Sequence, residues 1–170
     1  IYPISTLSGI TLPASGSRMF YGWTGLSSHT EIASLSTSHV TNLEEWFYKS
    51  RLGADLSSWD TSNVTNMLGA FNGASAINGA ESSIANWNTS NVTNMSSGFY
   101  DSETFAPYVG NWDVSSVTDF SYCFARITGV SVPISSWDTS SATDMSYMFE
   151  NGGINPDISN WNVSNVTDMR

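Results

Sequence analysis

Apolar and polar residues follow one another along this chain in a pattern that returns every 24 to 28 residues. Each copy opens with a large apolar residue and continues with a nearly constant polar run, as in WDTSNVTNM from Trp59 and WNVSNVTDM from Trp161. We number positions within a copy from this leading residue, which is position 0. A fixed period of this length predicts a repeat architecture. The leading residues are Leu35, Trp59, Trp87, Trp112, Trp137 and Trp161.

A phenylalanine stands at position +12 of every copy that reaches so far, whereas the distance from that residue to the next leading residue varies from 12 to 16. One half of each copy is therefore fixed in length and the other half absorbs insertions. Stacked repeats behave in this way, with loops varying on one side. We predict a structural ladder made of the leading tryptophans together with Phe47, Phe71, Phe99, Phe124 and Phe149.

Further apolar columns lie at position −3 (Ile, Leu or Val), at +5 (mostly Val) and at +8 (mostly Met). If each copy forms one coil, these columns stack into a continuous core that no single copy could close alone. Residues 1–34 contain only traces of the pattern, so we expect one or two degenerate coils there and tandem repeats over 35–170. Both ends of the pattern look cut, which suggests a fragment of a longer chain.

Local signals within the copy predict two short elements. Segments before the tryptophan, such as 54–57 and 130–133, are short and bounded by Gly or Pro, which is typical of brief strands. The Val-Thr-[Asn/Asp]-Met run predicts a helix of about two turns, with Thr as its N-cap and Met67 four residues from Phe71 on one face. The predicted fold class is an α/β repeat solenoid, coiled right-handedly, with one short parallel strand and one short helix per repeat.

Charge restricts the partners. Fifteen acidic residues against five basic ones give a net charge of −10, which repels nucleic-acid phosphates and anionic lipid headgroups. Only 12% of residues are charged, so neutral hydroxyls and amides must form much of the surface, which suits an extracellular or cell-surface location. No apolar run is long enough for direct membrane insertion. Six Asn-x-Ser/Thr sequons also arise from the repeat, and would matter only in a eukaryotic host.

Groups suited to catalysis are scarce. The only imidazoles are those of His29 and His39, and neither belongs to an arrangement that resembles a catalytic triad. Cys123 stands alone, so it can form neither an internal disulfide nor a zinc site made of thiolates. We therefore expect no enzymatic activity and no cofactor.

Position +7 holds Asn in the early copies and a carboxylate in the late ones, namely Asp119, Asp144 and Asp168. Stacked coils would place these like charges close together, so something must offset their repulsion. Calcium is one candidate, because it takes carboxylate oxygens. Backbone N–H groups of turns or helix starts are the other, and we favour them because Asn replaces Asp freely in this column.

Two further columns invite a functional interpretation. Thr recurs at +6, and a regular hydroxyl array could match an ice lattice; its interleaving with core Val and Met instead favours bonds to turn amides. The aromatic residues outside the ladder are the better contact candidates. These are Trp46, Tyr48, Tyr100 and Tyr108, with Trp23 and the variable loops 72–83 and 100–108 beside them.

The unit W-[DN]-[TV]-S-x-[VA]-T-[ND]-M-x-x-x-F resembles that of the BspA-like leucine-rich-repeat surface proteins of bacteria, over residues 32–170. The resemblance implies a leucine-rich-repeat-like coil on a secreted or wall-anchored protein associated with adhesion, and it supplies no catalytic residues. We accordingly expect a non-enzymatic scaffold that binds protein or glycan on a cell surface. The alternative is a stalk or filament subunit that acts through self-association, and an ice-binding surface is a third possibility.

Overall fold

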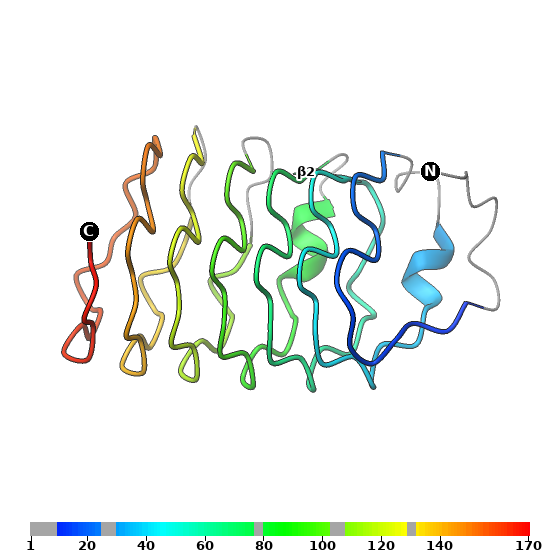
Figure 1. Cartoon of the computed structure of the whole chain (residues 1–170), viewed down its shortest axis with the longest axis horizontal. Helices are drawn as coiled ribbons and strands as arrows, with labels where there is room; N and C mark the ends of the chain where they lie inside the picture. The colour runs from blue at the N-terminus through cyan, green and yellow to red at the C-terminus, as the bar shows by residue number, and fades with distance from the viewer. Residues whose placement is uncertain (1–9, 25–29, 77–79, 103–107, 129–131) are drawn as a thin grey trace.

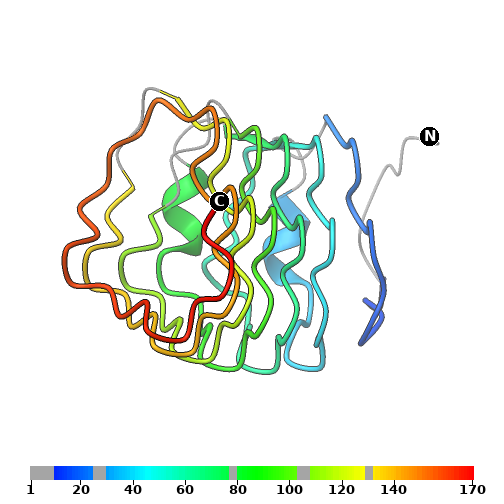
Figure 2. The same cartoon turned by 60° about the vertical axis from the view of Figure 1, so that its left-hand side comes forward.

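The copies of the repeat lie side by side as irregular coils of one stack (Figure 1). This computed structural model describes residues 10–24, 30–76, 80–102, 108–128 and 132–170. Regular elements within those ranges are few: the 3-10 helices η2 (Thr30–Ser34) and η3 (Ala80–Ile84), and the strands β1 (Arg51–Leu52) and β2 (Ser75–Ala76). β1 pairs with β2 in parallel, with Arg51 opposite Ser75. Figure 2 shows the same coils turned, each following the outline of the next.

The predicted α/β class, with a strand and a helix in every repeat, is wrong. Residues 54–57, expected to be a strand, form a bend and the start of a turn, and of 130–133 only the last two lie in the described part, without regular structure. The segment expected to be helical is a run of turns in each described copy. The described residues contain no α-helix at all.

The backbone hydrogen bonds of positions +7 to +15 explain why no helix forms there. We call this segment of each copy the zigzag wall. Alternate N–H groups donate to the following coil, as from Leu43 to the Asn66 carbonyl at 2.9 Å and from Glu45 to the Leu68 carbonyl at 2.9 Å. The N–H groups between them turn back within their own coil, as from Trp46 to the Leu43 carbonyl at 3.1 Å. An α-helix needs every N–H to reach four residues back, and the wall instead divides its donors between two directions.

Left-handed backbone at two fixed positions produces this alternation. Residues at +10 and +14 have φ between 51° and 65°, and most of them are not glycine. Such a residue costs roughly 1–2 kcal/mol, so the ladder of hydrogen bonds must offset it. Each one also reverses the local twist, which ends any helix that begins at the preceding Met. These residues are Glu45, Gly69, Ser97, Tyr122 and Tyr147 at +10, and Lys49, Gly73, Asp101, Arg126 and Asn151 at +14.

Aromatic side chains fill the interior of the stack. The ring of Phe99 lies 5.3 Å from that of Phe71 and 5.5 Å from that of Phe124, nearly parallel to both. The Trp87 ring lies 6.0 Å from that of Trp59, also parallel. Each leading tryptophan donates its indole N–H to the carbonyl of the position −3 residue in the preceding copy. These pairs are Trp59–Ile32, Trp87–Leu56, Trp112–Ile84, Trp137–Val109 and Trp161–Ile134.

Residues 10–24 form a further coil at the start of the described stack. The N–H groups of Arg18 and Phe20 donate to the carbonyls of Glu44 and Trp46 at 3.0 and 2.8 Å, in the pattern of the zigzag wall. The Phe20 ring also stacks on Phe47 with centroids 5.4 Å apart. The wall therefore runs without a break from this coil onward, and its outer side carries the surface considered next.

Candidate interaction surfaces

The structure separates the four aromatic residues that the sequence nominated for binding. Trp46 is 0% exposed, and its indole N–H donates to the Gly16 carbonyl at 2.8 Å, so it is a core residue. Tyr108 is 55% exposed and borders a shallow hollow of about 390 Å³. Tyr48 and Tyr100 lie on the outer side of the zigzag wall, where they join tyrosines that the sequence analysis did not select.

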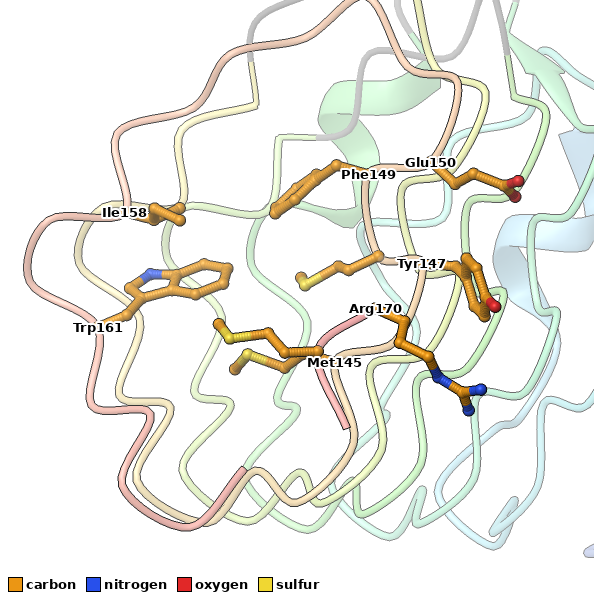
Figure 3. A pocket seen from close by; sticks show the side chains of 9 residues that line it. Met145, Tyr147, Phe149, Glu150, Ile158, Trp161 and Arg170 are labelled. Carbon is orange, nitrogen blue, oxygen red and sulfur yellow. The ribbon is translucent and has the colours of Figure 1, made fainter. Parts of the chain in front are cut away.

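Five tyrosines form rows along this outer side, and we call them the tyrosine wall. The ring of Tyr21 stacks on Tyr48 with centroids 4.8 Å apart and an interplanar angle of 7°. Farther along, Tyr122 stacks on Tyr147 at 4.8 Å and meets the edge of Tyr100 at 6.2 Å. Figure 3 shows Tyr147 directed away from the interior. The tyrosine wall comprises Tyr21, Tyr48, Tyr100, Tyr122 and Tyr147.

Four of the five basic residues of the chain lie over these rings. The Lys49 Nζ atom is 5.2 Å from the centroid of Tyr48, and the Arg126 guanidinium is 5.5 Å from that of Tyr100. Arg18 also pairs with the Glu45 carboxylate. Cations placed in this way are attracted to the aromatic ring and hold it in one orientation. The remaining pair is Arg170 over Tyr147, at 5.8 Å.

A sequence signal for the tyrosine wall exists, although it is weaker than that of the ladder. Tyr48 and Tyr100 each directly follow the phenylalanine of their copy, whereas Tyr122 and Tyr147 each precede it by two residues. Because the residues at these positions vary between copies, a search for constant columns passes over them. A search for recurring aromatic residues at variable positions would have found them.

The three calcium candidates act as turn acceptors. The Asp119 Oδ1 atom accepts the backbone N–H of Ser121 at 2.9 Å and its hydroxyl at 2.7 Å. Asp144 accepts the N–H of Ser146 at 2.8 Å, and Asp168 pairs with the guanidinium of Arg170. In the ranges that the structure describes, no three His, Cys, Asp or Glu side chains are grouped so as to hold a metal ion. The earlier copies use Asn42, Asn66 and Asn94 for the same turn bond.

A second set of turns follows the tryptophans. There the carboxylate at +1 accepts hydrogen bonds from the Ser hydroxyl and the Ser backbone N–H at +3. In three copies these bonds, the hydroxyl's more than the N–H's, lower the pKa of the carboxylate below its usual range. The Ser62 hydroxyl, for example, donates to Asp60 Oδ1 at 2.6 Å. These carboxylates are exposed, and their bonds within one turn fix its shape. The other two are Asp113 and Asp138.

The Thr column at +6 is exposed throughout, and only the Val beside it is buried in most copies. Both the N–H and the hydroxyl of Thr93 donate to the Thr65 carbonyl, at 2.9 and 3.2 Å, and Thr118 repeats this toward Thr93. The column is thus interleaved with the core along the chain but faces outward. Its hydroxyls donate to the backbone carbonyl of the preceding coil, and not to the turn amides that the sequence analysis favoured.

Two overlapping parts of the chain, residues 14–105 and 78–170, match the family described as "Mycoplasma protein of unknown function, DUF285". The chain belongs to the DUF285 family. No curated protein and no solved structure matches it. Together the two matches span residues 14–170, which include the zigzag wall of every copy.

A second hollow of the DUF285 chain, of about 300 Å³, is lined by Met145, Phe149 and Trp161 among others (Figure 3). In the other copies the phenylalanine of the following coil lies at this place, as Phe149 itself lies 6.1 Å from Phe124. The hollow is therefore the apolar stacking face of a coil, and its lining includes the exposed Ile158 and Met169. No helix in the described ranges of this DUF285 protein is both long and apolar enough to cross a bilayer.

The described side chains that were considered for catalysis, His39 and Cys123, contact the backbone of a neighbouring coil or lie in the core of this DUF285 protein. The His39 Nε2 atom lies 2.7 Å from the Leu12 carbonyl of the preceding coil. His29 lies outside the described residues. Cys123 is fully buried, and burial raises the pKa of its thiol far above the ordinary value. The thiol therefore stays protonated, and protonated thiols are poor nucleophiles.

Proposed function

We propose that this protein is a BspA-like surface or secreted scaffold that mediates adhesion, without catalysis, through contact with protein or glycan. The observation that carries the proposal is the tyrosine wall. Its side chains form two groups, Tyr21 with Tyr48 and Tyr100 with Tyr122 and Tyr147. Within each group they come from adjacent coils whose backbones are joined by hydrogen bonds, so the rings are presented in a fixed orientation. Tyr and Arg are enriched at protein contact sites, and Tyr supplies a large, amphipathic area at a low cost in conformational entropy.

The sequence resemblance supports the same proposal, and the match to the DUF285 family is consistent with a BspA-like repeat. A BspA-like repeat unit implies a surface location and adhesion, and the chain charge of −10 disfavours nucleic acid and anionic lipid as partners. The decisive experiment coats beads with the purified protein and counts their attachment to cultured cells. Beads coated with serum albumin are the control. Attachment no greater than the control, together with an empty glycan array, would refute adhesion.

A stalk or filament subunit is the second candidate. It is favoured by the single direction in which the hydrogen bonds of the zigzag wall run from coil to coil. Each coil donates its alternate N–H groups to the coil that follows and accepts from the coil before, as Phe99 donates to Cys123 at 2.9 Å. Copies stacked end to end would extend the same ladder, in the manner of a heterologous interface. Light scattering between low and high concentration tests this. Polymers that grow with concentration, without cell attachment, would favour the filament.

A further inference from the structure

The first two coils concentrate the basic charge of an otherwise acidic chain. Arg18, Lys49 and Arg51 are three of its five basic residues, and all three are exposed. Lys49 and Arg51 are adjacent to the buried Ser50 on either side, and both are exposed. Arg18 and Lys49 lie over the stacked rings of Tyr21 and Tyr48, and Arg51 follows Lys49 by two residues. We call these five residues the basic tyrosine cluster.

Two of these cations, Lys49 and Arg51, form no ion pair with a carboxylate of the described residues. Within the described ranges, the ion pairs shorter than 4.0 Å are Arg18–Glu45 and Arg170–Asp168. Lys49 instead lies over the ring of Tyr48, at 5.2 Å. Since Glu45 neutralises Arg18, the charge of Lys49 and Arg51 is left to attract an anionic group from outside.

Glycines in the next coil make room for this arrangement. A Cβ atom on Gly73 would come within 3.0 Å of Lys49 Cγ, and one on Gly69 within 3.2 Å of Glu45 Cγ. The stems of both side chains therefore lie across that coil. This lowers the number of conformations that Lys49 must lose when it binds, which favours binding.

The tyrosines determine which kind of anion fits. Tyr21 and Tyr48 cover each other at 4.8 Å, and Arg18 and Lys49 lie over the two rings. A sugar stacks on an open ring face, and this pair instead offers edges and hydroxyl groups. Hydroxyls and unpaired cations together suit a polypeptide, whose backbone and carboxylates supply both acceptors.

From this geometry we propose that the basic tyrosine cluster is a docking surface for an acidic polypeptide segment of a partner protein. The segment lies along the outer side of the first two coils. Its carboxylates pair with Lys49 and Arg51, and its backbone accepts hydrogen bonds from the hydroxyls of Tyr21 and Tyr48. The inference rests on the proposed adhesive function and assigns it a surface and a partner chemistry.

The test selects phage-displayed linear peptides on the whole protein and measures Kd for the recovered peptides, made synthetically. The recovered sequences should be enriched in Asp and Glu, and their Kd should rise about tenfold or more in a Lys49→Asn, Arg51→Ser double variant. Asn suits this site because Asn151 occupies position +14 of another copy with a φ of 51°. Binding should also weaken as salt rises from about 50 mM to about 500 mM, because salt screens exposed charges.

A matched control lies on the same wall. Tyr100 and Arg126 form another ring–cation pair, but Asp101 and Glu150 stand beside them. The Tyr100→Asn, Arg126→Asn double variant should leave the Kd within about twofold of the parent. A thermal melt of each variant shows that it is folded.

Three results would overturn the proposal: recovered peptides without acidic enrichment, equal losses in the two double variants, or binding of heparin but not of acidic peptides at the cluster. The last result would assign the surface to an anionic glycan. Cell attachment is measured in a separate assay. If the protein adheres to cells but its Lys49 and Arg51 double variant still binds the peptides, the proposed function stands and this docking surface is refuted.

Discussion

Replacement of Phe99 by alanine should destabilise the protein more than the same change at Phe149. The Phe99 ring is 1% exposed and stacks on two phenylalanines, whereas Phe149 is half-buried and stacks on one, at 6.1 Å. Truncation of a buried Phe costs about 3–5 kcal/mol, from lost transfer energy and the cavity that remains. For Phe149, with one stacking neighbour and partial exposure, we expect about 1–2 kcal/mol.

Urea denaturation followed by tryptophan fluorescence measures both variants, because the leading tryptophans become exposed when the coils separate. Phe99→Leu is the control for volume: it keeps most of the apolar surface and removes the ring stacking, so it should cost less than Phe99→Ala. In a stack where each coil touches only its neighbours, damage at the centre can also split the transition. Equal losses at the two sites, or a loss below about 1 kcal/mol for Phe99→Ala, would refute the stacked arrangement.

Three further predictions concern single contacts. Trp112→Phe removes the indole N–H from the buried Ile84 carbonyl, which lies 2.9 Å away, and should lower the free energy of unfolding by about 1–3 kcal/mol in urea titration. Gly110→Ala would place a Cβ atom 2.6 Å from the Pro133 carbonyl oxygen and should lower the Tm, whereas Gly153→Ala, with its nearest neighbour at 3.5 Å, should leave the Tm nearly unchanged. The folded state lowers the pKa of the Asp113 carboxyl, so its stabilising effect is complete above the unfolded value of about 3.9 and is lost as pH falls through the folded value. Asp113→Asn keeps the turn acceptor without titrating, so its urea midpoint should fall less than that of the parent between about pH 5 and pH 2.5; a parallel fall would contradict this.

The sequence predicted neighbours better than it predicted backbone. The constant spacing of Trp and Phe indicates which residues contact one another, and Phe71 does lie against Phe99 at 5.3 Å. The helix prediction was wrong because an Asn or Asp after Thr is compatible with two local structures, a helix start and a turn. Asn66 after Thr65 can begin a helix, yet its Oδ1 accepts the Leu68 N–H at 3.0 Å in a turn. Asn and Asp favour both arrangements, so their presence could not decide between them.

The decisive feature was the left-handed backbone at +10 and +14, where the sequence gives little warning. Glycine would signal it, and does so at Gly69 and Gly73 in one copy and at Gly22 in the coil before Leu35. Elsewhere the same conformation is taken by residues such as Tyr122 and Arg126, which avoid it in isolation. Hydrogen bonds to the neighbouring coils stabilise it, and this contribution depends on the stack and is not visible in any single copy.

The same backbone explains why the contact candidates were only partly found. The residue at +10 has left-handed backbone, which a helix does not contain. A helix would therefore have placed the side chain of Tyr122 differently relative to that of Phe124. Several positions at the surface differ between copies, as Tyr48, Asn72 and Glu150 do at +13. A search for constant columns does not find residues of this kind, and the basic tyrosine cluster consists of them.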